Sequence, residues 1–121
     1  MSGRIRIREG EAARDDADAV VEAAACDLAA GEESIRAALR DGLERARARG
    51  CCSVAVPALG AGGGLPLQRC AEILLAEARR HLAGDTCIEE IRFVVLGEPA
   101  LRVFESVHDA ARIAEHAARW S

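Results

Sequence analysis

A run of glycines is the feature of this sequence that most directly suggests binding chemistry. Gly60, Gly62, Gly63 and Gly64 follow a short apolar segment and precede a stretch with helical periodicity. Glycine lets the backbone approach an anion closely, and the N-terminus of a following helix offers unpaired N–H groups and the positive end of the helix dipole. The arrangement suits a phosphate or pyrophosphate group, and a plain flexible turn is the alternative.

The glycine run matches neither of two common nucleotide-binding motifs. A P-loop requires Lys followed by Ser or Thr at fixed positions, and the sequence has neither there. A dinucleotide-binding G-x-G-x-x-G does not follow the first strand either. The glycine run by itself therefore leaves phosphate binding and a flexible turn equally open.

The cysteines are a second group that could do chemistry: Cys26, Cys51, Cys52, Cys70 and Cys87. No pair has C-x-x-C spacing and the histidines do not join them in a zinc pattern, so we expect no metal and no cofactor. An odd number of cysteines without a signal sequence indicates reduced thiols and a cytoplasmic location. We favour cysteine as a small apolar packing residue. A nucleophilic Cys51 or Cys52 is the minor alternative, because it needs a nearby base, for which the candidates are His81, His108 and His116.

The charged residues argue against a nucleic-acid partner. All 16 basic residues are arginine, the formal net charge is −4, and only two Phe and one Trp could stack on bases. Arg4, Arg6 and Arg8 alternate, which on a strand puts them on one face. For these three we favour a solvated edge strand over a phosphate-attracting face. A second group, Arg45, Arg47 and Arg49, lies near the end of a predicted helix, where arginines complement the helix dipole.

Alternating strands and helices must position these residues. Residues 4–8 alternate strictly and predict a half-exposed strand, whereas residues 52–57 and 91–96 are apolar runs typical of buried strands. Helical stripes predict helices over residues 33–49 and 66–83. A last helix starts near Pro99, with an inward stripe of Leu101, Phe104, Val107, Ala111, Ala114 and Ala118.

This order of elements predicts a single α/β domain over residues 1–121, with a largely parallel sheet and right-handed crossovers. Residues 18–25 fit either a strand, because of their paired valines, or a helix, because of their alanines. No apolar run is long enough to span a bilayer, so we expect no membrane partner.

The residues around the glycine run resemble a known family. Residues 53–62, Ser-Val-Ala-Val-Pro-Ala-Leu-Gly-Ala-Gly, are similar to the second phosphate-binding loop of macro domains, the ADP-ribose-binding α/β modules. In that family the loop is followed by a glycine-rich turn, a proline and an Ala-rich helix, which residues 71–74 continue here. The resemblance covers nearly the whole chain and is strongest over residues 50–97.

The N-terminal part is similar to the same family. Macro domains have Gly-Asp-Ile-Thr and then Val-Asp-Ala-Ile-Val-Asn-Ala-Ala-Asn, and this chain has Gly-Glu-Ala-Ala at residues 10–13 and Ala-Asp-Ala-Val-Val-Glu-Ala-Ala-Ala at residues 17–25. The resemblance implies a strand over residues 18–23. It also implies that Glu11 stands where the family has the carboxylate that contacts the adenine amino group.

The departures from the family pattern concern catalysis. The two family asparagines fall on Glu22 and Ala25, and the sequence contains no Asn at all. The second asparagine orients the distal ribose and, in hydrolytic members, helps to position the attacking water, whereas an alanine side chain forms no hydrogen bond. The first glycine-rich loop is reduced to Gly31, a middle stretch is absent, and Gly or Leu65 replaces the customary aromatic. We therefore expect no efficient ADP-ribosyl hydrolysis.

The resemblance implies a reduced three-layer αβα fold with a mixed, largely parallel sheet, and a non-catalytic binder of ADP-ribose or a related phosphate-containing nucleotide. The candidate binding residues are Glu11, Pro57, Ala58, Gly60, Ala61, Gly62, Gly63 and Gly64, and none is assigned a catalytic role. The alternative is an interaction scaffold that has lost its ligand. Missing strands expose sheet edges, which a homodimer would cover, and the Ala-rich residues 110–120, ending in Trp120, could contact that partner.

Overall fold

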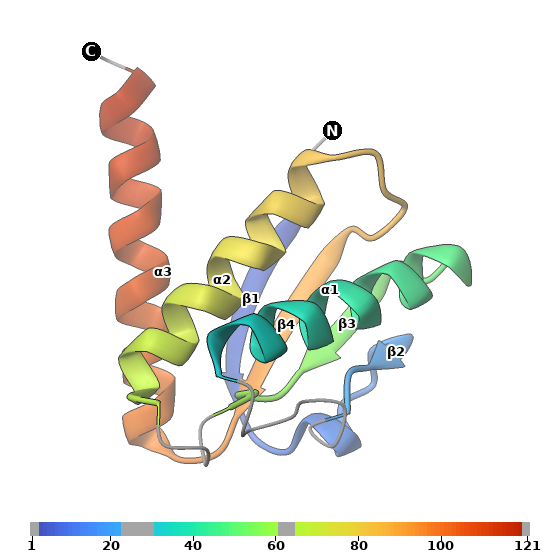
Figure 1. Cartoon of the computed structure of the whole chain (residues 1–121), viewed down its shortest axis with the longest axis horizontal. Helices are drawn as coiled ribbons and strands as arrows, with labels where there is room; N and C mark the ends of the chain where they lie inside the picture. The colour runs from blue at the N-terminus through green and yellow to red at the C-terminus, as the bar shows by residue number, and fades with distance from the viewer. Residues whose placement is uncertain (1–2, 23–30, 61–64, 120–121) are drawn as a thin grey trace.

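Strands and helices alternate along the chain much as the sequence predicts. The structure, a computed structural model, describes residues 3–22, 31–60 and 65–119, without the side chains of residues 118 and 119. Its elements in chain order (Figure 1) are β1 (Arg4–Glu9), the 3-10 helix η1 (Ala12–Arg14), β2 (Ala19–Val20), α1 (Glu32–Ala48), β3 (Ser53–Val56), α2 (Leu67–Ala83), β4 (Glu90–Val95) and α3 (Glu98–Arg119).

The four strands form one sheet in the order β1-β4-β3-β2, and every pairing among the described residues is parallel. The predicted α/β fold class is therefore confirmed. The antiparallel part of the expected mixed sheet is not found in the described residues. Parallel pairing brings the carboxyl ends of all four strands to one edge of the sheet.

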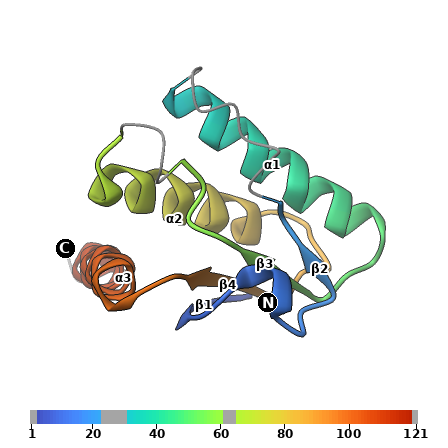
Figure 2. The same ribbon diagram turned by 90° about the horizontal axis from the view of Figure 1, so that it is seen from below.

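The connections between strands decide which face each helix covers. From β2 to β3 to β4 the chain moves in one direction across the sheet, and α1 and α2 lie on one face (Figure 2). From β1 to β2 it moves in the other direction, so a right-handed crossover puts η1 on the opposite face. The last helix, α3, contacts β1 and α2.

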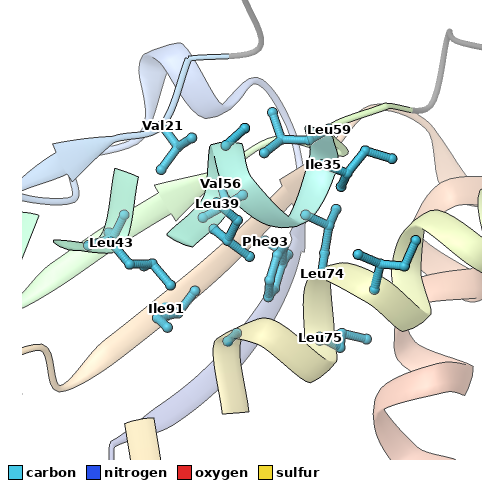
Figure 3. Packing of buried hydrophobic residues seen from close by; sticks show 14 of the residues in the cluster. Val21, Ile35, Leu39, Leu43, Val56, Leu59, Leu74, Leu75, Ile91 and Phe93 are labelled. Atoms are coloured by element: carbon cyan, nitrogen blue, oxygen red, sulfur yellow. The ribbon is translucent and has the colours of Figure 1, made fainter. Parts of the chain in front are cut away.

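The face of the sheet under α1 and α2 carries the main hydrophobic core (Figure 3). Leu39, Leu43, Leu74 and Phe93 are fully buried there. Complete burial of one such side chain contributes about 1.5–3 kcal/mol. The predicted helical stripe over residues 33–49 is confirmed. Gly42 lets α1 approach the residue after β2, because a Cβ atom at this position would lie 2.7 Å from Val21 Cγ2.

The opposite face of the sheet carries an ion-pair network centred on Arg92 of β4. Its guanidinium donates hydrogen bonds from Nη1 to Asp15 (2.6 Å) and Asp16 (2.7 Å), and from Nε to Glu90. Asp15 and Asp16 belong to the segment between η1 and β2. The network therefore ties that segment to the middle of the sheet.

The alternating arginines of β1 extend this network. Arg4 Nε and Arg6 Nε lie 3.1 Å and 3.5 Å from Glu90 Oε1, and Arg8 Nη1 lies 3.8 Å from Asp15 Oδ2. All three arginines stay exposed, as expected for the solvated face of an edge strand.

The second strand is shorter than the resemblance implies. A strand was expected over residues 18–23, but β2 comprises Ala19–Val20, with one further backbone hydrogen bond from Val21 N to Ala55 O (2.9 Å). The Asp18 carboxylate instead accepts hydrogen bonds from the backbone N–H groups of Cys52 (2.8 Å) and Ser53 (3.3 Å). Residue 23 lies outside the described residues.

The inward stripe predicted on the last helix is wrong for its second half. Phe104 is buried and packs against Phe93 with tilted rings, their centroids 5.7 Å apart, whereas Ala111 is only half-buried and Ala114 is exposed. The reason is length: 22 helical residues extend roughly 33 Å, whereas the six residues of β1 extend roughly 20 Å. The second half of α3 therefore projects beyond the sheet (Figure 1). The remaining stripe residue, Ala118, lies outside the described side chains.

Candidate functional site

A cleft of ≈ 830 Å³ opens at the carboxyl edge of the sheet. Its walls come from the ends of all four strands and from the starts of α2 and α3. In open parallel sheets, ligands bind in the crevice beyond the carboxyl ends where the direction of crossover changes. Here that change falls between β1 and its neighbour β4, because η1 and the other helices cover opposite faces.

The first wall of the cleft follows β1. Gly10 N donates a hydrogen bond to Val95 O (2.8 Å), and Glu11 then presents an exposed carboxylate whose Oε2 lies 3.1 Å from Arg14 Nε. Within η1, Ala12 is buried against Ala55 and Val94 on the second face of the sheet. The place of Glu11 is therefore set by the small apolar contact beneath it.

The wall formed by β3 contains two of the predicted binding residues, Pro57 and Ala58. Beyond them the chain turns tightly, with a hydrogen bond from Leu59 N to Pro57 O (2.8 Å) and a positive φ of 83° at Gly60. A Cβ atom at Gly60 would lie against Ile35 Cδ1 and 2.8 Å from its Cγ1. Glycine is needed here for both the backbone conformation and the close approach to α1.

The predicted site residues are thus only partly brought together. Glu11, Pro57 and Ala58 line the cleft, whereas Gly60 is buried beside α1 and is not among the lining residues. The other four predicted residues, Ala61, Gly62, Gly63 and Gly64, lie outside the described residues.

Some lining residues were missed by the sequence reasoning. Glu22 follows β2 on the cleft wall, whereas the family resemblance identifies it only as the replacement of an asparagine. Val94 and Leu96 come from the end of β4, and Leu96 is 70% exposed although it is apolar. The sequence prediction of a buried strand over residues 91–96 is therefore wrong at Leu96, because β4 ends at Val95, and no local pattern marks that end.

The described lining is mainly apolar. Its ionisable residues are Glu11 and Glu22, both acids, and the others are Gly, Ala, Val, Leu and Pro. Among the described lining residues, the side chains therefore bring no positive charge to an anionic ligand. Backbone N–H groups would have to supply it.

The first turns of the two helices beside the site are joined by an ion pair. Arg69 of α2 donates hydrogen bonds to both carboxylate oxygens of Glu32 in α1, at 2.9 Å and 2.8 Å. The hydrogen bond from Arg69 lowers the pKa of Glu32, and Glu32 in turn raises the pKa of Arg69. A bidentate pair of this kind fixes the relative orientation of the two side chains. It therefore holds the N-terminus of α1 beside the N-terminus of α2.

The cysteines give no support to the nucleophile alternative. Cys52 is exposed next to the amino end of β3, at the edge of the sheet opposite the cleft. Although the residue is exposed, partial desolvation of its sulfur and the nearby charges of Glu89 and Asp18 raise the pKa of the Cys52 thiol, which disfavours the reactive thiolate. His81 lies 2.8 Å from Thr86 Oγ1, and His108 lies 3.3 Å from Arg79. Among the described residues no cluster of three potential metal ligands is found.

The comparisons with known proteins agree with this geometry. The Macro domain family model matches residues 3–74, which is more than half of the chain. The chain belongs to the Macro domain family. A macrodomain of Oceanobacillus iheyensis with ADP superposes on this macro domain with a TM-score of 0.64 at 19% identity, over 69% of this chain and 44% of that one. The macro domain of ganglioside induced differentiation associated protein 2 gives 0.59 at 26% identity, over 65% and 40%.

Sequence relatives of this macro domain include an uncharacterized protein of Mycobacterium tuberculosis and one of Mycobacterium bovis. Each is 37% identical over 79 residues, which is 64% of this chain. The matched region spans only 21% of the first protein and 22% of the second. The macro domain thus corresponds to about a fifth of these relatives. In the described residues no helix is long and apolar enough to cross a membrane.

Proposed function

We propose that this macro domain binds ADP-ribose or a related phosphate-containing nucleotide in the cleft and does not hydrolyse it. The observation that carries the proposal is the ≈ 830 Å³ cleft at the carboxyl edge of the sheet, with Glu11, Pro57 and Ala58 on its walls. Relatives support the choice of ligand: structures of the Oceanobacillus iheyensis macrodomain contain ADP or ADPR, and a Trypanosoma brucei macrodomain is in complex with ADP.

The walls suggest how the ligand is held. The nucleoside lies against the apolar side chains of Val94 and Leu96, and the Glu11 carboxylate accepts a hydrogen bond from an exocyclic amino group. We place the diphosphate at the glycine segment of residues 61–64, next to the first turn of α2, whose N–H groups suit an anion.

The absence of hydrolysis follows from the replaced side chains. Where the family has asparagines this chain has Glu22 and Ala25, and Glu22 lies on the cleft wall. A carboxylate repels an anionic ligand, and an alanine does not position water. Incubation with a mono-ADP-ribosylated protein tests this part of the proposal. We expect no release of ADP-ribose above the rate without protein, and release that rises with protein concentration would contradict it.

Titration calorimetry tests the binding itself. ADP-ribose, ADP and inorganic phosphate are titrated separately into the protein, and we expect saturable 1:1 binding that is tightest for ADP-ribose. Glu11→Ala should weaken ADP-ribose binding roughly tenfold, as expected for loss of a charge-assisted hydrogen bond. Glu33→Ala is the matched control, because Glu33 is an exposed acid on α1. Absence of heat with all three ligands would refute the proposal.

An interaction scaffold is the second candidate function. The specific observation that favours it is the second half of α3, whose residues 112–117 are all exposed and which projects beyond the sheet. Light scattering coupled to chromatography separates the two functions. A tight homodimer without nucleotide binding would favour the scaffold, and a nucleotide-binding monomer would exclude it. The cytoplasmic location and the absence of a nucleic-acid partner remain predictions.

A further inference from the structure

Glu22 is an acid on the cleft wall whose charge no described side chain balances. Its side chain is exposed and lines the cleft, and it forms no hydrogen bond or ion pair with another described residue. The second acid of the described lining, Glu11, lies 3.1 Å from Arg14, measured from Oε2 to Nε. Of these two carboxylates, that of Glu22 is therefore the one left for a charged group of a ligand.

The two acids lie at different ends of the cleft. In the strand order β1-β4-β3-β2, the strands β1 and β2 form the two edges of the sheet (Figure 1). Glu11 comes two residues after β1, and Glu22 comes two residues after β2. Neighbouring strands lie about 4.8 Å apart, so the three spacings between these edges amount to roughly 14 Å. A ligand that contacts both acids must therefore extend along the carboxyl edge of the sheet.

The middle of the cleft lies between these two ends. Pro57 and Ala58 follow β3, and Leu67 belongs to the first turn of α2, beside which the proposed function places the diphosphate. With the base at Glu11 and the diphosphate beside α2, the ribose on the far side of the diphosphate lies toward Glu22. The group attached to that ribose is then the part of the ligand that the Glu22 carboxylate faces.

The charge of Glu22 discriminates among the groups that a ligand can carry at this end. The described lining has two acids and no base, and the formal net charge of the chain is −4. A carboxylate repels a negative group, gains little from a neutral one and attracts a cation. Because Glu22 is exposed, solvent screening limits the resulting difference in affinity to about fivefold or less.

We propose that Glu22 makes the cleft selective for nucleotides whose far ribose carries a positively charged group. The Glu22 carboxylate pairs with that group, and a ligand without the charge binds more weakly. Oxidised nicotinamide dinucleotide, NAD⁺, belongs to this class because its pyridinium ring is cationic, whereas the ring of the reduced form, NADH, is neutral. This inference rests on the proposed function and adds to it a residue that determines specificity.

Calorimetric titration with NAD⁺ and with NADH tests the proposal, because the two ligands differ by one hydride, which removes the charge of the ring. We expect the unaltered chain to bind NAD⁺ about threefold more tightly than NADH at low salt, and high salt to reduce this ratio. In Glu22→Gln the two affinities should become equal. Glu115→Gln is the matched control, because it removes an exposed acid from the second half of α3 and should keep the ratio. Equal affinities in the unaltered chain, or an unchanged ratio in Glu22→Gln, overturn the proposal.

A charge reversal and a titration with ADP-ribose complete the test. Glu22→Arg should bind NADH more tightly than NAD⁺, and far-UV circular dichroism shows that this variant is folded. A preference that does not reverse overturns the proposed pairing. If ADP-ribose binds the unaltered chain while NAD⁺ and NADH bind it equally, the inference fails and the proposed function stands. Absence of binding by all three nucleotides overturns both.

Discussion

The two faces of the sheet are held by different forces. Under α1 and α2, side chains such as Leu39, Leu43 and Phe93 are fully buried in an apolar cluster. On the other face, Arg92 joins Asp15, Asp16 and Glu90 in a network of ion pairs. Apolar burial does not depend on charge, whereas ion pairs depend on pH and on each partner being present. The two faces should therefore respond differently to mutation and to acid.

The second face matters for the site because it holds one wall of the cleft. The segment that contains Asp15 follows directly on η1, and η1 begins next to Glu11. The ion pairs of Arg92 thus fix the approach of this segment to β4, while the main core fixes the helices. Mutations in the main core should therefore lower stability, whereas mutations in the Arg92 network should also lower ligand affinity.

The largest loss of stability is expected on the apolar face. Leu39→Ala removes a fully buried side chain between α1 and the sheet and should lower the free energy of unfolding by about 3 kcal/mol. Urea denaturation followed by circular dichroism measures it. Leu96→Ala, at an exposed position, should cost less than about 0.5 kcal/mol. Equal losses in the two variants would mean that this face is not the main source of stability.

A smaller loss is expected on the charged face. Arg92→Met leaves the carboxylates of Asp15 and Glu90, whose side chains are 6% and 10% exposed, without their main partner. We expect a loss of about 2 kcal/mol, below the usual 3–5 kcal/mol for a broken buried pair because Arg92 is itself partly exposed. The affinity for ADP-ribose should fall as well, since the wall with Glu11 loses its anchor.

Arg102→Met is the matched control for that variant. Arg102 forms an exposed i,i+4 pair with Glu98 on α3, so its loss should change neither stability nor nucleotide affinity measurably. If Arg92→Met behaved like this control, the network would have no role in holding the cleft wall.

Acid should weaken the charged face selectively. Burial by itself raises the pKa of Glu90, but the hydrogen bond and charge of Arg92 outweigh it and hold the pKa below the ordinary 4.5. A carboxyl group with a lowered pKa stabilises the fold above its unfolded-state pKa, and this stabilisation is lost as the pH falls through the lowered value. Urea midpoints measured from pH 6 to pH 3 should therefore drop below about pH 4.5, and less steeply in Arg92→Met. If the urea midpoints of the unaltered protein and of Arg92→Met fell equally steeply with pH, the Arg92–Glu90 pair would not be the source of the acid sensitivity.

A weaker effect of pH on stability is expected from two histidines, His81 of α2 and His108 of α3. Burial is the main cause that lowers the pKa of both His81 and His108 from the ordinary 6.5. Neutral histidine is then favoured in the fold, so stability is full above pH 6.5 and declines as the pH falls toward the lowered values. His108→Gln should flatten part of this decline between pH 6.5 and pH 5. An unchanged slope in that interval would exclude His108 as a contributor.

The smallest expected effect lies in the cleft. Glu22→Gln keeps the shape of an exposed side chain and removes one negative charge facing the ligand. Affinity for ADP-ribose should rise roughly threefold at low salt, and less at high salt because exposed charges are screened. Calorimetry at two salt concentrations measures both. A loss of affinity would mean that the Glu22 carboxylate contacts the ligand favourably.

Sequence patterns predicted the helices and the longer strands well. The stripe of α1 and the apolar runs of β3 and β4 depend on local periodicity, which the sequence shows directly. Two features depended on tertiary partners and were missed. The end of β2 after Val20 has no signal in the paired valines, and the exposed half of α3 follows from the limited length of β1.

The cleft residues that belong to the family motifs could be predicted from the sequence, and the others could not. Pro57 and Ala58 follow from the loop motif, and Glu11 follows from the aligned N-terminal motif. Leu96 lies in the cleft because parallel pairing brings the end of β4 beside the end of β1. No local sequence pattern shows this pairing. The same holds for Arg92, whose partners lie 76 and 77 residues away in the sequence.

The most direct test of the central claim is a titration of ¹⁵N-labelled protein with ADP-ribose, followed by the amide signals in NMR spectra. Binding in the cleft should shift the signals of Gly10, Glu11 and Ala58 and those of the glycines in residues 60–64, and should leave the signals of residues 109–117 unchanged. Inorganic phosphate alone should move only signals of the glycine segment. Unchanged spectra at millimolar ADP-ribose, or shifts confined to residues away from the carboxyl edge of the sheet, would contradict a nucleotide-binding cleft in this macro domain.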